Sequence, residues 1–170
     1  MEYKKGDYIR YSSNGVCLID DIKSMDINHT KKPKDFYVLK PISASSSTIY
    51  VPLDNEELVS KMRYILSIND VDTLIDSVKQ DRTDWIADRK ERNNVFKQII
   101  KDAQPNELLK LVGCIYLKKQ ALLKEGRKLS TTDENYLSQA ESLIENEFAF
   151  VLKLDGIDVG NYIRTRLEID

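Results

Sequence analysis

Residue types able to carry out chemistry are few in this 170-residue chain, which has two cysteines, Cys17 and Cys114, and one histidine, His29. So small a set gives no cluster with metal-ligand spacing and no pairing of cysteine or serine with histidine for nucleophilic catalysis. Both cysteines lie in apolar runs, which predicts buried free thiols. We therefore expect no catalytic residue, no metal and no cofactor, and the chain is predicted not to be an enzyme.

The single tryptophan, Trp85, is followed by a polar run, because no apolar side chain occurs at positions 88–94. A helix that buried Trp85 would place apolar residues three, four and seven positions further on. Those positions hold Asp88, Arg89 and Arg92. The pattern predicts a ring that is presented to solvent. The alternative is a ring that packs over the end of a helical bundle, with its N–H bonded to a neighbouring carbonyl.

Charge is distributed unevenly along the chain, although the formal net charge is only −2. Residues 82–128 carry twelve Lys and Arg against six acids, whereas residues 129–170 carry three against nine. This pattern indicates a local basic region inside an acidic average. The alternative is that charges on neighbouring helices neutralise one another. The cations at positions 118–128 either extend a basic surface or interact favourably with the C-termini of helices. They are Lys118, Lys119, Lys124, Arg127 and Lys128.

The first 55 residues have the pattern of short antiparallel strands. Two β-prone runs, 8–11 and 16–22, flank Asn14-Gly15, whose residue types tolerate positive φ and predict a hairpin. Two further runs, FYVLKPI and TIYVPL, follow with turn residues between them. Strands this short cannot cover an open sheet, so a small SH3-like barrel is expected.

From residue 54 onward the apolar residues recur with helical spacing, and the helix ends carry recognisable signals. Acids follow Asn55 at the first helix, Ser67 or Asn69 can cap the second, and Asp84 is expected to cap a helix that begins at Trp85. Pro105 and Gly126 bound an apolar central helix at 106–123. Ser130 with Asp133 resembles a capping box for the next helix, and Asp158 is expected to start a last short helix.

The predicted fold class is therefore α+β: a small N-terminal antiparallel β-barrel followed by a C-terminal all-α helical bundle. We expect a barrel domain at 1–55, a connecting helix or linker at 56–66 and a helical domain at 67–170. The sequence has no apolar run long enough to span a membrane and no signal-peptide pattern, so a cytoplasmic location is expected, with no membrane partner.

Short motifs in a fixed order resemble the CarD family of bacterial transcription regulators. They are Lys5-Gly6-Asp7 opening a strand, Asn14-Gly15 in a turn, Val51-Pro52 with Asn55, the lone Trp85, and the stretch KLSTTDENYLSQAESLIENEFA. The resemblance runs from about residue 5 to residue 150. It implies a Tudor-like barrel, shared with transcription-repair coupling factors, that binds the β subunit of RNA polymerase.

The same resemblance implies that the helical domain approaches promoter DNA at the upstream edge of the melted region. A tryptophan matching Trp85 would wedge into the minor groove there and stabilise the open complex. Basic neighbours would attract phosphates without reading sequence. The expected DNA-binding residues are Trp85, Arg89, Lys90, Arg92 and Lys97. The expected state is a monomer, with a domain-swapped dimer as the alternative.

Several positions depart from the family pattern. Tyr50 and Met25 stand where the family has arginines that contact polymerase, and Ala87 and Asp88 stand where it has positive charge. Polymerase binding can persist by β-augmentation, in which main-chain hydrogen bonds carry affinity. The expected partner-binding residues are therefore Tyr50, Met25, Ile49 and Val51. A second function stays open: a Tudor-like protein-interaction adaptor without DNA binding.

Overall fold

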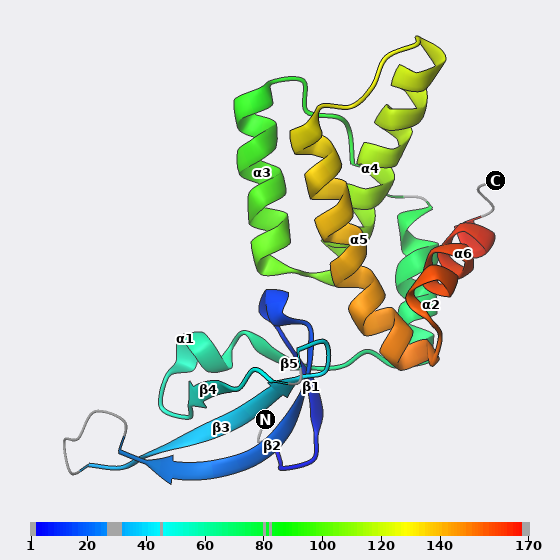
Figure 1. The fold of residues 1–170 in the computed structure, drawn as a ribbon. Helices are drawn as coiled ribbons and strands as arrows, with labels where there is room; N and C mark the ends of the chain where they lie inside the picture. The colour runs from blue at the N-terminus through cyan, green and yellow to red at the C-terminus, as the bar shows by residue number, and fades with distance from the viewer. Residues whose placement is uncertain (1–2, 27–31, 45, 80, 82, 168–170) are drawn as a thin grey trace. The chain divides into compact units, whose positions relative to one another are not determined.

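The computed structural model describes residues 3–26, 32–44, 46–79, 81 and 83–167. His29 lies outside these described residues. The chain divides into two compact units, Met1–Ile65 and Leu66–Asp170, and each is described separately. The first unit is built on strands and the second on helices (Figure 1). The α+β class is therefore confirmed.

The N-terminal unit is built on one five-stranded antiparallel sheet with the strand order β4-β3-β2-β1-β5. Its elements are β1 (Tyr8–Tyr11), the 3-10 turn η1 (Ser12–Asn14), β2 (Val16–Met25), β3 (Lys34–Pro41), β4 (Ile49–Pro52), the helix α1 (Glu56–Val59) and β5 (Met62–Tyr64). The predicted hairpin is present, and Gly15 turns its corner with φ +77°. The sheet is open between β4 and β5, so the predicted closed barrel is not observed.

The segment 56–66, expected as a connection, contributes to the sheet instead. Asn55 caps α1 by accepting a bond from the Leu58 N–H, as the acids after Asn55 suggested. After α1 the chain returns along β1, where Tyr11 faces Met62 and Ile9 faces Tyr64. The strand β5 therefore belongs to the sheet, and the first unit extends to Ile65.

The core of this unit is formed by alternate side chains of the strands, as expected for a sheet with one buried face. Its buried members are Tyr3, Ile9, Tyr11, Cys17, Ile19, Tyr37, Leu39, Val51 and Met62. A shift in the β2–β3 register between Ile19 and Asp21 changes the alternation, so that Ile22 and not Asp21 lies on the same face as the core residue Tyr37. Ile22 itself is 39% exposed.

The described residues of the second unit form five helices: α2 (Ile68–Val78), α3 (Arg89–Asp102), α4 (Pro105–Lys124), α5 (Thr131–Leu152) and α6 (Gly156–Leu167). Four of the predicted boundary signals are confirmed. Ser67 forms a capping box with Asp70, Pro105 opens α4, Gly126 follows its end at φ +69°, and Ser130 caps α5.

Two predicted helix starts were wrong. The helix after Trp85 begins at Arg89, because the Asp88 carboxylate, and not that of Asp84, accepts the Glu91 N–H at 2.7 Å. The last helix begins at Gly156, and Asp158 lies within its first turn. The helix α4, predicted to be central, packs against α2, α3 and α5, while α5 packs against α2, α3, α4 and α6. Leu117 and Leu123 on α4 are about half exposed, at 46% and 50%. In the described part of the chain, every helix is too short or too polar to span a membrane.

Both cysteines are free and buried, as the sequence predicted. Burial raises the pKa of the Cys17 thiol to about 11, and the charge of Arg10 opposes that rise. Burial also raises the pKa of Cys114, with a smaller contribution from Asp84. Each thiol is consequently held in its protonated, weakly nucleophilic form.

We expect Cys17 in a Cys114→Ser variant to resist iodoacetamide at pH 9, where a free thiol with a pKa of about 8.5 is mostly thiolate. The unfolded thiol ionises first. Stability from this group is therefore present below about pH 8.5 and is lost as the pH rises toward the folded pKa of about 11. Labelling of the folded chain at the rate of a urea-unfolded control would contradict this assignment.

Candidate functional site

Trp85 lies in the loop that precedes α3 and is half-buried. Its ring meets Phe96 edge to face, with centroids 6.1 Å apart and planes at 72°. The prediction of a ring that is presented and not packed was therefore wrong in part. The spacing argument failed because Trp85 is outside the helix, so its ring packs on Phe96, eleven positions further on.

Two cations from different helices lie against the Trp85 ring. The Arg92 Cζ, from α3, is 4.6 Å from the ring centroid, and the Lys118 Nζ, from α4, is 5.6 Å from it. Both separations are within the range of a cation–π interaction. Lys118 was not among the predicted site residues. The only signal for it in the sequence was its place in the basic region.

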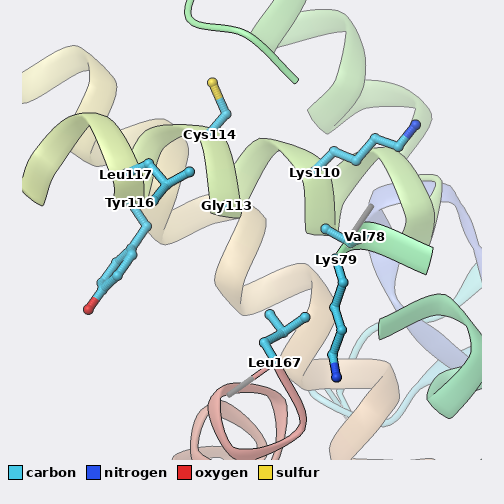
Figure 2. Close-up of a pocket in the computed structure, with 8 residues that line it drawn as sticks. All are labelled: Val78, Lys79, Lys110, Gly113, Cys114, Tyr116, Leu117 and Leu167. Atoms are coloured by element: carbon cyan, nitrogen blue, oxygen red, sulfur yellow. The ribbon is translucent and has the colours of Figure 1, made fainter. Parts of the chain in front are cut away.

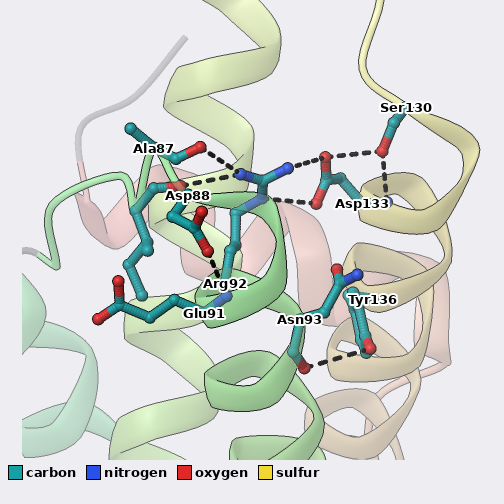
Figure 3. Close-up of polar contacts among 9 residues, drawn as sticks. Ala87, Asp88, Glu91, Arg92, Asn93, Ser130, Asp133 and Tyr136 are labelled. Carbon is teal, nitrogen blue, oxygen red and sulfur yellow. Dashed lines mark hydrogen bonds and ion pairs between the residues drawn. The ribbon is translucent and has the colours of Figure 1, made fainter.

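The Arg92 side chain is buried, with 7% of the residue exposed, and each guanidinium nitrogen donates a hydrogen bond. Nε and Nη2 donate to the two carboxylate oxygens of Asp133 at 3.0 and 3.3 Å. Nη1 donates to the carbonyls of Ile86 and Ala87 at 2.9 and 3.2 Å (Figure 3). The expectation that Arg92 is an exposed DNA-binding cation was therefore wrong, because this side chain is buried and its donors bind groups inside the helical unit.

Asp133 is fixed in turn by the start of α5. The Ser130 hydroxyl donates to Asp133 Oδ2 at 2.7 Å and accepts the Asp133 N–H at 3.1 Å (Figure 3). One turn further along α5, the Tyr136 ring stands edge to face on Phe96 at 5.7 Å. A continuous network thus connects the Trp85 loop with α3 and the first turns of α5.

The other predicted basic residues, Arg89, Lys90 and Lys97, are exposed on α3. Lys90, Lys97 and Lys101 are seven and four residues apart, which places them on one face of the helix. Arg89 lies about a quarter turn away from that row. Asp88 has a structural role as the N-cap of α3. The exposed cations of α3 are therefore this lysine row and Arg89, and the half-buried Lys118 of α4 lies against the Trp85 ring.

A groove of about 160 Å³ lies between α2, α4 and α6 (Figure 2). Its lining residues are Val78, Lys79, Lys110, Gly113, Cys114, Tyr116, Leu117 and Leu167. The hydrogen bond from Lys110 to Asp81 raises the lysine pKa and ties the start of the Trp85 loop to α4. The described residues contain no group of three His, Cys, Asp or Glu side chains placed to hold a metal ion.

The predicted partner-binding residues lie on the sheet, where β4 is an edge strand. Tyr50 is 47% exposed and Ile49 is half-buried, so both can meet a partner. Val51 is fully buried in the core, and its side chain cannot make the predicted contact because it points into the unit. Met25 pairs with Lys34 at the far end of β2, with β3 between it and β4. The structure therefore does not bring Met25 beside Tyr50.

Hydrogen bonding distinguishes the two edges of the sheet. Leu53 N–H donates to the Asp35 carbonyl at 2.9 Å, so alternate residues Val51 and Ile49 turn their main-chain groups toward β3. Tyr50 turns its N–H and C=O away from the sheet. On β5 the outward carbonyls are covered: the Tyr3 hydroxyl donates to Met62 at 2.8 Å and Arg63 Nη1 donates to Tyr64 at 3.1 Å.

We expect Asp133→Ala to lower the free energy of unfolding by about 3–5 kcal/mol, because it leaves the buried Arg92 guanidinium without its counterion. Urea denaturation followed by circular dichroism measures this. The matched control is Glu134→Ala, at an exposed neighbouring position of the same helix turn. This change should stay within about 0.5 kcal/mol of the wild type. Equal effects of the two substitutions would contradict the role given to the ion pair.

Comparison with known proteins gives one family. The family model of the CarD-like/TRCF RID domain matches residues 3–63. The match covers the sheet from before β1 into β5, and it does not extend into the helical unit. A search of curated proteins finds no match to this chain. Residues 3–63 therefore match the CarD-like/TRCF RID domain, which confirms the resemblance for the N-terminal unit.

Proposed function

We propose that this protein is a non-catalytic transcription regulator that binds the β subunit of RNA polymerase through its N-terminal unit and acts on promoter DNA through its helical unit. The family match at residues 3–63 carries the proposal, since this domain suggests interaction with RNA polymerase. In this role the protein acts as a monomer in a bacterial cytoplasm, without a cofactor.

The edge strand β4 is the proposed polymerase contact. The main-chain N–H and C=O of Tyr50 point outward, which is what an added strand requires. Pro52 ends the strand and suits an edge position, because proline has no N–H for a ladder. The opposite edge is less suitable because side chains of Tyr3 and Arg63 already bind its carbonyls.

Substitution at Tyr50 separates the main-chain contact from the side-chain contact. In the main chain, Tyr50→Pro removes only the outward N–H, so the hydrogen bonds between β3 and β4 should stay in place. We expect it to weaken binding to the isolated polymerase β-subunit lobe by roughly 2- to 10-fold, the value of one hydrogen bond. Tyr50→Val keeps the N–H and should bind more tightly than Tyr50→Pro. Equal affinities for these two variants, measured by calorimetry, would rule out β-augmentation at this edge.

The helical unit is the proposed DNA contact. Trp85 is only half-buried, and Lys118 lies beside its ring, while Lys90 and Lys97 line one face of α3. A ring set against an unstacked base step at the edge of the melted region offsets an unstacking cost of roughly a few kcal/mol. The lysines attract phosphates without sequence preference. Lys118 takes the place that Arg92 had in our sequence-based prediction.

We expect Trp85→Ala to leave lobe binding unchanged and to shorten the lifetime of the open promoter complex by roughly tenfold, as the loss of about 1–3 kcal/mol of ring–base stacking implies. The open-complex lifetime of Trp85→Phe, which keeps an aromatic ring, should fall between the lifetimes of the wild type and Trp85→Ala. Lifetimes measured at two salt concentrations separate the ring from the lysines, because Lys118→Gln should reduce the salt dependence and Trp85→Ala should not.

The second candidate function is an adaptor that binds polymerase, or another partner, without touching DNA. The observation in its favour is that Trp85 is half-buried and that Arg92 is held inside the unit. The experiment above decides between the two functions. An adaptor would bind through the sheet edge and leave the open-complex lifetime unaffected in both the wild type and Trp85→Ala.

A further inference from the structure

One side chain of the following helix binds the main chain of the loop that carries Trp85. Arg92 Nη1 donates to the carbonyls of Ile86 and Ala87, the two residues directly after the tryptophan. The Arg92 Cζ also lies 4.6 Å from the centroid of the Trp85 ring. A single guanidinium therefore contacts both the ring and the main chain that sets its direction.

The guanidinium can do this because its other side is anchored. Nε and Nη2 engage both carboxylate oxygens of Asp133, which is only 2% exposed and is itself held by Ser130. A planar group with donors on two sides is needed for this arrangement, since a lysine ammonium cannot bind a carboxylate in a bidentate manner and reach two carbonyls as well.

The role of Arg92 differs from that of the second cation near the ring. Lys118 is half-buried and comes from α4, so it can approach a phosphate beside the ring. Arg92 is 7% exposed, and its donors are engaged by Asp133, Ile86 and Ala87. Its contribution to any contact made by Trp85 is therefore indirect.

We propose that Arg92 is a positioning residue for Trp85, which fixes the loop 85–88 against the start of α5 and so determines which part of the ring faces outward. The use of this positioning in DNA binding rests on the proposed function, whereas the positioning itself does not. A ring held in one orientation loses less freedom on contact with a base step than a ring on a mobile loop.

The test uses the full chain and intrinsic fluorescence, which reports on Trp85 alone because it is the only tryptophan. In Arg92→Lys we expect retained helical circular dichroism, a shift of the emission to longer wavelength and increased quenching by acrylamide. The matched control is Arg89→Lys, the same change at an exposed position of α3. It should leave the emission and the quenching as in the wild type.

A folded Arg92→Lys protein with wild-type emission and quenching would overturn the proposal. If Arg92→Lys does not fold, Asp133→Asn decides by the same measurement. This second variant keeps an acceptor for Arg92 but removes the charge that anchors it. Unchanged fluorescence of folded Asp133→Asn would also overturn the proposal, and increased quenching would support it.

A double-mutant cycle on open-complex lifetime distinguishes positioning from a general loss of stability. If Arg92 acts through Trp85, the effects of Arg92→Lys and Trp85→Ala should depart from additivity by roughly twofold or more, and the double variant should resemble Trp85→Ala. Additive effects would overturn the proposal. If Trp85→Ala itself has no effect on lifetime, the proposed DNA contact fails, and the fluorescence still decides whether Arg92 positions the ring.

Discussion

The buried ion pair between Arg92 and Asp133 joins α3 and the Trp85 loop to the start of α5 in the helical unit. Both groups are buried, and two charges removed from water are tolerated only when their geometry satisfies both. Satisfying both requires α3, α5 and the Trp85 loop to hold one fixed arrangement. The rings of Trp85, Phe96 and Tyr136 come from the same three segments and pack edge to face, with Phe96 between the other two.

The two units rely on different physical means to present their surfaces. The helical unit fixes one large ring by side-chain contacts, with a buried charge as the anchor. The N-terminal unit presents main-chain groups of its edge strand β4. Alternate residues of this strand turn their N–H and C=O groups outward, away from β3. Burial raises the pKa of Tyr3, so its hydroxyl stays protonated and remains a donor to the far edge of the same sheet.

Local signals predicted the helix ends well, because a cap depends on residues three positions apart. Ser67 with Asp70 and Ser130 with Asp133 are such cases. The sequence did not predict β5, since the pairing of Met62 with Tyr11 joins distant segments and three residues carry little pattern of their own. For the site, the positions of Trp85, Arg89, Lys90 and Lys97 were predictable as residue types. The burial of Arg92 was not predictable, because it depends on Asp133, which is distant in the sequence and was predicted only as part of the cap at Ser130.

The unequal edges of the sheet have a consequence for assembly. A chain that adds strands at both edges can join copies of itself without limit, as in fibrous aggregates. Here the carbonyls of Met62 and Tyr64 are already bound by side chains of the same unit, so strand addition is favoured at β4 only. Among the described residues this sheet therefore favours one-sided strand pairing, which joins a single partner and is less suited to filament growth than a sheet with two open edges.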